Sequence, residues 1–238
     1  MEKKKFAAIV LSAGSGSRMH SEIPKQYMQL AGFPVIYYSL KAFEESAVDE
    51  IILVCGSSDE AFCRKNIVEK YGFSKIKAVV PGGGERYLSV YEGLKAVDAD
   101  YVLIHDGARP VIDADNISRS METVVVEKAC VLAVPVKDTI KIADSEDYAA
   151  STPDRSLLWA VQTPQSFQTS LLREAYSRFF AAQKEGVKLP MVTDDAMLVE
   201  RMTGQKVKLI SGNYENLKIT TPEDLLLAKA FLEFRKNV

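Results

Sequence analysis

Short runs of apolar, mostly β-branched residues recur through the first half of the chain, and each is followed by a polar or glycine-rich turn and a stretch of helical periodicity. This alternation predicts an α/β fold, a Rossmann-like, doubly wound, mostly parallel sheet. The expected strands are 6–11, 50–55, 76–80, 101–105 and 130–134, and the clearest helices between them are 34–47 and 87–97. Ligands of such sheets gather beyond the carboxyl ends of the strands, so the turns after residues 11, 80 and 105 should face one crevice.

The pattern changes after residue 135. Residues 136–142 and 157–161 alternate apolar and polar side chains on either side of a polar turn, which is typical of antiparallel strands. We therefore expect one domain spanning 1–238, from which 136–161 protrudes as a β-hairpin arm. Because a long two-stranded arm is not stable alone in water, it should lean on its own domain or on a second copy, and a homodimer is predicted. The remaining expected elements are helices at 170–184 and 194–202, a strand at 206–210 and a last helix from Pro222.

The composition excludes several classes of partner. A formal net charge of −2 gives no general basic surface, so no nucleic acid is expected. No apolar run approaches the ~18 residues of a membrane span, and no export signal is recognised, so no membrane is expected and the protein should be cytoplasmic. Reduced, buried thiols are expected at Cys55, Cys63 and Cys130, which form no C-x-x-C pair. With only two histidines, a zinc site lacks ligands, so any metal should be hard and bound by oxygen.

The first candidate site is the loop S-A-G-S-G-S-R-M at 12–19, followed by P-K-Q at 24–26. Glycine and serine let backbone N–H groups approach a phosphate, and Arg18 and Lys25 supply countercharge. Met19 stands where a dinucleotide-binding fingerprint needs a third small residue, and the G-x-x-x-x-G-K-[ST] of a P-loop is absent. The loop suits a bound nucleoside triphosphate, with a purely structural turn as the alternative.

Two further turns carry unusual residues. The segment P-G-G-G-E-R-Y-L-S at 81–89 would let the backbone lie against a base or ribose, with Ser89 supplying hydrogen bonds, although a flexible connector is the plain alternative. In H-D-G-A-R-P at 105–110, Asp106 suits a ribose hydroxyl or a phosphate-bound Mg²⁺, and Arg109 could pair with it or with a substrate. A structural Asp–Arg pair is the alternative there. We expect His105 to be a buried, hydrogen-bonded side chain and not a general base.

Polar segments in the second half of the chain add two more cations. They are K-D-T at 137–139, D-R at 154–155, Q-T-P-Q at 162–165, T-D-D at 193–195 and N-L-K at 216–218. Each one alone is an ordinary turn or helix cap. Together they offer Arg155, Lys218 and several hydroxyl groups, which a phosphorylated polyol would need.

Taken in order, these segments resemble the cytidylyltransferases that make 4-diphosphocytidyl-2-C-methyl-D-erythritol in the non-mevalonate isoprenoid pathway. The resemblance runs nearly end to end. It rests on A-G-x-G-x-R-M joined to P-K-Q-Y, G-G-x-E-R-x-x-S, H-D-x-A-R-P, D-R-x-x-L-W to Q-T-P-Q, T-D-D-A and N-x-K-I-T-x-P-E-D. Two residues depart from the pattern, since Gly84 and Gly107 stand where an acidic residue and an alanine are expected.

This resemblance implies a fold of the nucleotidyltransferase type and transfer of CMP from CTP to the phosphate of 2-C-methyl-D-erythritol 4-phosphate, with release of pyrophosphate. Arg18 and Lys25 would stabilise the α-phosphate, with Mg²⁺ held mainly by the CTP phosphates and by no protein metal site. Arg155 and Lys218 would position the attacking phosphate. By the same resemblance, the nucleotide is bound by Ser12, Ala13, Gly14, Gly16, Gly83, Gly84, Ser89 and Asp106. The polyol phosphate is bound by Asp106, Arg109, Thr139, Arg155, Thr163, Thr193 and Lys218, of which Thr139 and Arg155 lie on the arm and could serve the partner subunit's site.

Three alternatives remain open at this point. A ribitol 5-phosphate cytidylyltransferase shares the fold, the P-K-Q element and T-P-Q-S-F, although L-W at 158–159 and T-D-D-A at 193–196 favour the methylerythritol enzyme. An NAD-dependent oxidoreductase would need the missing small residue and an acid after the second strand, for which Asp59 is a loose candidate. A non-catalytic nucleotide-binding module would have little use for four separate cations directed at one crevice.

Overall fold

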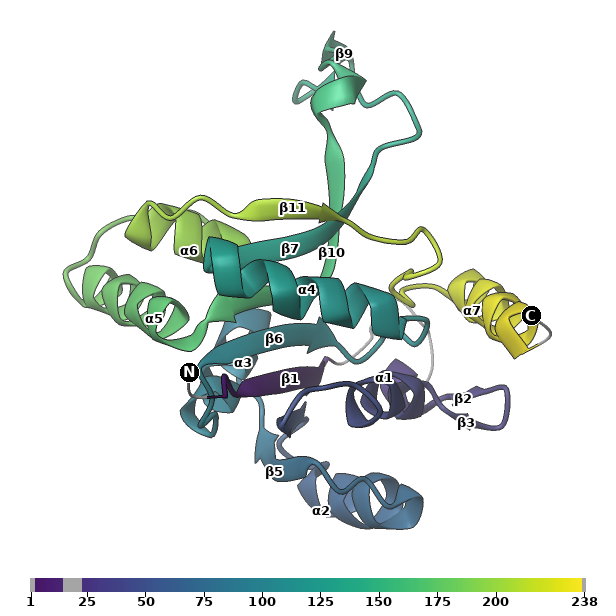
Figure 1. The fold of residues 1–238 in the computed structure, drawn as a ribbon. Helices are drawn as coiled ribbons and strands as arrows, with labels where there is room; N and C mark the ends of the chain where they lie inside the picture. The colour runs from purple at the N-terminus through teal and green to yellow at the C-terminus, as the bar shows by residue number, and fades with distance from the viewer. Residues whose placement is uncertain (1–2, 15–22, 237–238) are drawn as a thin grey trace.

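A seven-stranded sheet forms the centre of the molecule, whose computed structural model describes residues 3–14 and 23–236 (Figure 1). The strand order is β11-β7-β10-β6-β1-β4-β5. The bounds are β1 Phe6–Ser12, β4 Glu50–Cys55, β5 Ile76–Pro81, β6 Tyr101–Asp106, β7 Ala129–Pro135, β10 Trp159–Gln168 and β11 Lys208–Ser211. Neighbouring strands are parallel except where β10 pairs with β6 and β7. The expected doubly wound, mostly parallel sheet is therefore confirmed, and its five predicted parallel strands differ from the observed ones by at most one residue at either end.

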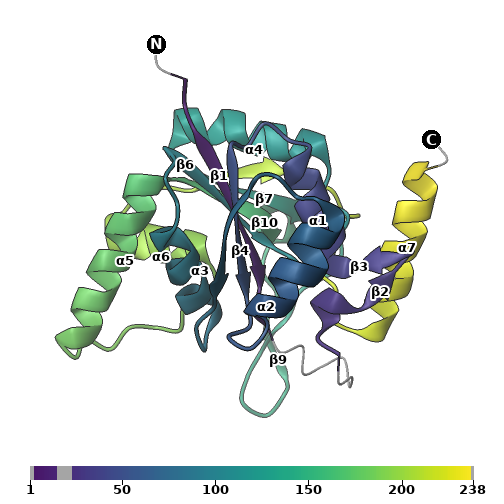
Figure 2. The ribbon, with the colours of Figure 1, turned by 90° about the horizontal axis from the view of Figure 1, so that it is seen from below.

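Helices cover both faces of the sheet (Figure 2). One face carries α3 Arg86–Lys95, α5 Thr169–Lys184 and α6 Asp195–Thr203. The other carries α1 Val35–Glu44, α4 Ala114–Glu127 and a helix that starts as α2 Glu60–Phe62 and continues with π-helical turns over Cys63–Glu69. The last helix, α7 Pro222–Lys236, packs beside α1 and a small hairpin of β2 Gln29–Leu30 and β3 Phe33–Pro34.

The central strand β1 shows why the apolar runs are continuous. Ala7 and Ile9 contact the α3–α5 side of the core, whereas Ala8 and Val10 contact the α1–α4 side. All four side chains are fully buried. Because both faces of a parallel sheet are covered by helices, its inner strands need apolar residues at every position. The sequence pattern thus identified the strands, while the helices close both layers of the core.

The strand β10 was only partly predicted. Residues 157–161 were expected to belong to the arm, but Trp159, Ala160 and Val161 pair with β7 in the main sheet, and the strand continues to Gln168 beside β6. The register shifts between Val161 and Gln165. Residues 162–166 are polar side chains and a proline, a composition that is typical of a turn, so the sequence did not indicate a strand there. It nevertheless lies deep in the structure, with Gln162, Thr163, Gln165 and Ser166 all buried.

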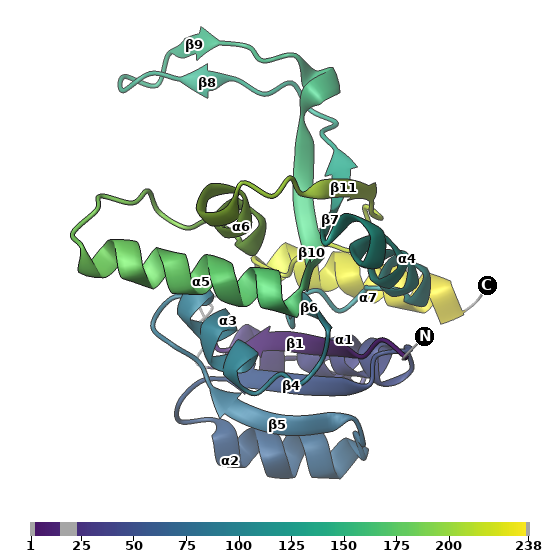
Figure 3. The same cartoon turned by 60° about the vertical axis from the view of Figure 1, so that its left-hand side comes forward.

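A segment comprising residues 136–158 projects from the body of the molecule (Figures 1 and 3). Its ladder is short and joins β8 Ile142–Ala143 to β9 Ala149–Ser151, followed by a 3₁₀ turn at Arg155–Leu157. The expected pairing of 136–142 with 157–161 is wrong, because only a Val136 N–H to Leu158 O bond of 3.0 Å links these stretches directly. Since the segment lies away from the helices, it has no core to hold a longer ladder together. We call 136–158 the projecting segment.

The other boundaries follow the prediction closely. The helix expected at 34–47 begins at Val35, with Pro34 as its N-cap residue, and the strand expected at 206–210 is β11. The helix expected from Pro222 is α7, and the three cysteines are buried and unbridged as expected. In the described part of the chain, no helix has the length and hydropathy needed to cross a membrane.

Gly107, directly after β6, explains one departure from the expected pattern. Its N–H donates to the Leu11 carbonyl at 2.8 Å, which ties the ends of β6 and β1 together. A Cβ at this position would overlap Ile36 Cδ1 and lie 2.8 Å from the Leu11 carbonyl oxygen. The backbone of this turn approaches its neighbours too closely for the alanine that the family pattern suggests.

We predict that Gly107→Ala lowers the free energy of unfolding by about 1–3 kcal/mol, the usual cost of overpacking. Ile36→Val in the same chain should recover part of this loss by removing Cδ1, while the contact with the Leu11 carbonyl persists. Urea denaturation of both variants measures the effect. Gly84→Ala is the matched control, because a Cβ there meets nothing within 4 Å and should change stability little. Equal stability of Gly107→Ala and the wild type would contradict the prediction.

Candidate active site

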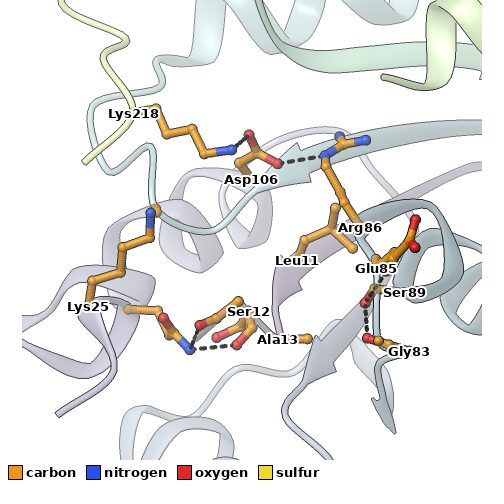
Figure 4. A pocket seen from close by; sticks show the side chains of 14 residues that line it. Leu11, Ser12, Ala13, Lys25, Gly83, Glu85, Arg86, Ser89, Asp106 and Lys218 are labelled. Atoms are coloured by element: carbon orange, nitrogen blue, oxygen red, sulfur yellow. Dashed lines mark hydrogen bonds and ion pairs between the residues drawn. The ribbon is translucent and has the colours of Figure 1, made fainter. Parts of the chain in front are cut away.

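Two adjoining cavities open at the carboxyl ends of β1, β5 and β6. The first has a volume of about 430 Å³ and lies between the loop after β1, the glycine turn after β5 and the end of β6. The second, of about 270 Å³, lies between β6, β10 and the start of α6. Three charged side chains, Arg86, Asp106 and Lys218, line both cavities. Figure 4 shows them from the first cavity, with Lys25 directed toward the same space.

Asp106 is the carboxylate around which the cations gather. Its Oδ2 lies 2.8 Å from Lys218 Nζ, its Oδ1 lies 3.2 Å from Arg86 Nε, and Arg109 Nε is 3.8 Å from Oδ2. The residue is 7% exposed. Burial alone would raise the pKa of Asp106, but the charges of Arg86, Lys218 and Arg109 outweigh it and hold the pKa well below its usual range. The carboxylate is therefore ionised at any physiological pH.

Arg86 was quoted in the G-G-x-E-R segment but was assigned no role from the sequence. It is the first residue of α3, and its Nη1 donates to Asp195 Oδ2 at 2.7 Å while its Nε donates to Asp106. Asp195 is completely buried, so its charge needs such a partner. The signals available in the sequence were an arginine two residues after a triple glycine, at a strand-to-helix junction, and a T-D-D segment with two adjacent carboxylates much later in the chain.

Lys218 and Lys25 are held by the chain that follows β11. Lys25 Nζ donates to the Ile219 carbonyl at 2.8 Å, and the Ile219 N–H donates to the Ala108 carbonyl at 2.8 Å. Arg109 Nη1 donates to the Asn216 carbonyl at 2.7 Å. These bonds dock residues 216–219 onto the turn after β6. Two lysines far apart in the sequence thereby reach one cavity.

Glycines shape the first cavity where two backbones approach each other. A Cβ on Gly82 would lie 2.6 Å from Ala13 Cβ, and one on Gly83 would overlap Leu88. Gln26 supports the facing loop, because its Nε2 donates to the carbonyls of Ser12 at 2.7 Å and Gly14 at 3.2 Å. Predicted nucleotide-binding residues that line this cavity are Ser12, Ala13, Gly14, Gly83, Gly84, Ser89 and Asp106. The sequence prediction missed the supporting role of Gln26.

His105 has the buried, hydrogen-bonded environment that the sequence predicted. Its Nε2 lies 3.2 Å from the Arg109 carbonyl, which requires an N–H there, so Nδ1 accepts from the Thr163 hydroxyl at 3.0 Å. The same Thr163 oxygen accepts the Asp106 N–H at 3.1 Å. Burial lowers the pKa of His105 to about 4. The neutral ring thus helps to orient the backbone of Asp106.

The second cavity holds most of the predicted polyol-binding residues. Asp106, Arg109, Thr163, Thr193 and Lys218 all line it. Arg109 Nε is buried and has no hydrogen-bond acceptor among the described residues. A buried donor without a hydrogen bond is rare, and Arg109 Nε has only its 3.8 Å ion pair with Asp106 Oδ2, so this cavity-lining arginine suits an anionic or hydroxylated ligand.

Four predicted residues lie elsewhere. Gly16 and Arg18 fall outside the described residues. Thr139 and Arg155 belong to the projecting segment and line neither cavity, and Arg155 Nη1 donates to the Lys137 carbonyl at 2.9 Å. Within one chain, the fold therefore brings Lys25 and Lys218 together and leaves Arg155 apart.

The described residues include no cluster of three or more histidine, cysteine, aspartate or glutamate side chains that could hold a metal ion. Asp106 itself already has three cationic neighbours. Since these cations would repel a divalent metal, the carboxylate is a poor metal ligand in this arrangement. The crevice is instead suited to anions, because glycine-rich turns line one side and lysine and arginine side chains line the other.

Comparison with known proteins gives a consistent result. Residues 6–234 match the family described as 2-C-methyl-D-erythritol 4-phosphate cytidylyltransferase. The chain is 54% identical over 228 residues to the protein of that name from Lachnospira eligens, covering 95% of this chain and 98% of the relative. It is 49% identical to the one from Lachnoclostridium phytofermentans, with 96% and 97% covered. Among solved structures, a 4-diphosphocytidyl-2C-methyl-D-erythritol synthase from Anaerococcus prevotii superposes with a TM-score of 0.83 at 37% identity, covering 97% of this chain and 96% of that one.

We predict that His105 makes the protein less stable as the pH falls below 7. The unfolded imidazole takes a proton near pH 6.5, whereas the folded one does so only near pH 4, so the unfolded state binds more protons between these values. The wild type should lose roughly 2 kcal/mol more between pH 7 and pH 5 than His105→Gln, whose amide cannot titrate. Urea midpoints of both proteins at the two pH values provide the measurement, and equal losses would show that His105 is not the group responsible.

Proposed function

The chain belongs to the 2-C-methyl-D-erythritol 4-phosphate cytidylyltransferase family, and we infer that it transfers the CMP group of CTP to 2-C-methyl-D-erythritol 4-phosphate. The products are 4-diphosphocytidyl-2-C-methyl-D-erythritol and pyrophosphate, in non-mevalonate isoprenoid biosynthesis. The observation that carries this function is the meeting of two cavities at Asp106, with Lys25 in the first, Arg109 in the second and Lys218 in both. That arrangement suits two phosphorylated ligands placed end to end.

We propose that CTP occupies the first cavity. The close approach of Gly82 to Ala13 supports a narrow slot for the cytosine and ribose, with Ser12, Gly14, Gly83, Gly84 and Ser89 around it. Lys25 and Arg18 would stabilise the α-phosphate as charge accumulates on its oxygens in the transition state. The position of Lys25 beside the cavity supports its part in this role.

The polyol phosphate is proposed to occupy the second cavity. Its phosphate group is the nucleophile and is ionised near neutral pH, so the protein needs no strong base and contributes alignment and charge. Lys218 would direct this phosphate to the α-phosphate, while Asp106, Arg109 and Thr193 would bind the polyol. Because the Thr163 hydroxyl already bonds to His105 and the Asp106 N–H, we assign it the role of positioning Asp106.

Mg²⁺ is proposed to enter with CTP, held mainly by the phosphate oxygens. The lack of a carboxylate cluster among the described residues and the three cations at Asp106 support this arrangement over a resident metal site. When bound, the ion would neutralise part of the triphosphate charge. The side chains would still have to align the two phosphates.

We further propose that the projecting segment forms a homodimer and that its Thr139 and Arg155 complete the partner subunit's site. Apolar side chains of the segment are exposed, including Ile142 at 54%, Tyr148 at 70% and Leu157 at 77%. A two-stranded ladder with exposed apolar side chains needs a further surface to become stable.

The three free thiols support a reducing, cytoplasmic location.

We predict that the purified protein releases pyrophosphate when CTP, Mg²⁺ and 2-C-methyl-D-erythritol 4-phosphate are present together. Omission of any of the three should reduce release to background. Ribitol 5-phosphate, which lacks the branched methyl group, is the matched control and should react far more slowly. A coupled pyrophosphate assay gives both rates. Release with ribitol 5-phosphate alone would overturn the assignment of substrate, and no release with either would overturn the assignment of function.

The role of the projecting segment predicts complementation between inactive subunits. Lys25→Ala and Arg155→Ala homodimers should each lose at least about 10²-fold in kcat. After subunit exchange, half of the dimers are hybrids, and one of the two sites in each hybrid keeps both cations, so about one quarter of wild-type activity should return. Differently tagged subunits report the exchange, and two batches of Lys25→Ala provide the control mixture. Complete exchange without recovery would mean that each site is completed within one chain.

A further inference from the structure

Arg86 lies at the boundary of the two cavities and has no part in the roles proposed above. We propose that Arg86, braced by Asp195, is a positioning residue that holds Asp106 in place during the reaction. This inference rests on the proposed function, because it concerns the site where the two substrates meet. It is carried by the geometry of one guanidinium group between two carboxylates, Nε at 3.2 Å from Asp106 Oδ1 and Nη1 at 2.7 Å from Asp195 Oδ2.

The far end of this contact is fixed by the core. Asp195 is 0% exposed, and its N–H donates to Gln165 Oε1 at 3.0 Å. Its Oδ1 accepts from the Tyr176 hydroxyl at 3.3 Å. The same hydroxyl lies 3.0 Å from the carbonyl of Tyr87, the residue after Arg86. Asp195 is therefore anchored to β10 and α5, and it anchors Arg86 in turn.

At the end of this contact that faces the cavities, the two oxygens of Asp106 have different nearest partners. Oδ1 faces Arg86 and Oδ2 faces Lys218. If Lys218 turns toward a substrate phosphate, Oδ2 loses its nearest cation, keeps Arg109 Nε at 3.8 Å, and becomes available to a polyol hydroxyl. Arg86 does not need to move, since its other end stays on Asp195. The carboxylate then keeps its charge and orientation while Lys218 changes partner.

Arginine is required for this task by its shape. The planar guanidinium presents donors in fixed directions, so one side chain can bond two carboxylates at once. A lysine at this position would bring the same charge as a single point and could not hold both contacts with comparable geometry. Arg86 lines both cavities although its side chain is only 27% exposed, so it borders a bound substrate without filling either cavity.

Two roles for Arg86 give different results in a double variant. If Arg86 only neutralises the buried charge of Asp195, then Arg86→Gln should be inactive through damage to the fold, and Arg86→Gln with Asp195→Asn should recover wild-type activity. If Arg86 positions Asp106, the double variant should fold like the wild type and remain impaired. We expect the second outcome, with kcat/KM for the polyol phosphate reduced on the order of 10²-fold, the typical cost of a small misplacement in an active site.

Further measurements separate positioning from general structural damage. KM for CTP should change little, because the first cavity keeps its glycine turn and Gln26, whereas KM for the polyol phosphate should rise. Loss of one cation beside Asp106 should raise the pKa of that carboxyl, so the acidic limb of the kcat/KM profile should move to higher pH. Arg86→Lys, which preserves the total charge, should fold normally, keep the wild-type pH profile and show a smaller rise in KM for the polyol phosphate. Arg178→Gln on the exposed face of α5 is the matched control and should behave as the wild type.

Wild-type kcat/KM for the polyol phosphate in Arg86→Lys, or full recovery in the double variant, would overturn the proposal. An inactive wild-type protein would instead contradict the proposed function, so the two failures are distinguishable. Circular dichroism and urea denaturation of each variant establish that the compared proteins are folded.

Discussion

The ion pairs centred on Asp106 hold together the parts of the chain that form the active crevice. Asp106 ends β6, Arg86 begins α3, Lys218 follows β11, and Asp195 begins α6. A carboxylate this deeply buried is tolerated only when cations and hydrogen bonds surround it, so each partner must be delivered to within about 3 Å. The neutral His105 and the Thr163 hydroxyl fix the backbone of Asp106 through its N–H. The same interactions that make the burial of Asp106 tolerable create a cationic boundary between two cavities.

Close backbone approach is the second constraint on the site. The turns after β1, β5 and β6 meet where Gly82 faces Ala13 and where Gly107 faces Leu11. Side chains at these glycines would push the turns apart and widen the first cavity. The small residues therefore do more than allow flexible loops, since they set the distance between the segments that are proposed to enclose the nucleotide.

The projecting segment differs from the rest of the molecule because it has no buried core of its own. Its side chains are mostly exposed, it contributes nothing to the buried clusters of the sheet, and its ladder pairs only β8 with β9. Apolar side chains such as Tyr148 are costly to expose to water, and a surface that covers them would remove this cost. A second subunit would do so and would also bring Arg155 to a site that its own chain does not reach. Catalysis and dimerisation would then depend on the same segment.

The five parallel strands and their flanking helices follow from the sequence alone, because residues buried on both faces must be apolar at every position and the chain can satisfy this only with helices on both sides. The motifs likewise predicted Lys25, Asp106, Arg109 and Lys218 as site residues, and the fold places all four around the two cavities. Residues 162–168 of β10 could not be predicted as a strand, since the buried glutamines and threonine there satisfy their hydrogen bonds with distant segments such as 213–216 and the start of α6. The role of Arg86 was equally hidden, because a guanidinium between Asp106 and Asp195 exists only after α3, β6 and α6 have packed. The sequence by itself thus determined the layers and the chemical character of the crevice, while only the tertiary structure decided which charges face each other, because such pairing depends on distances between segments that are remote along the chain.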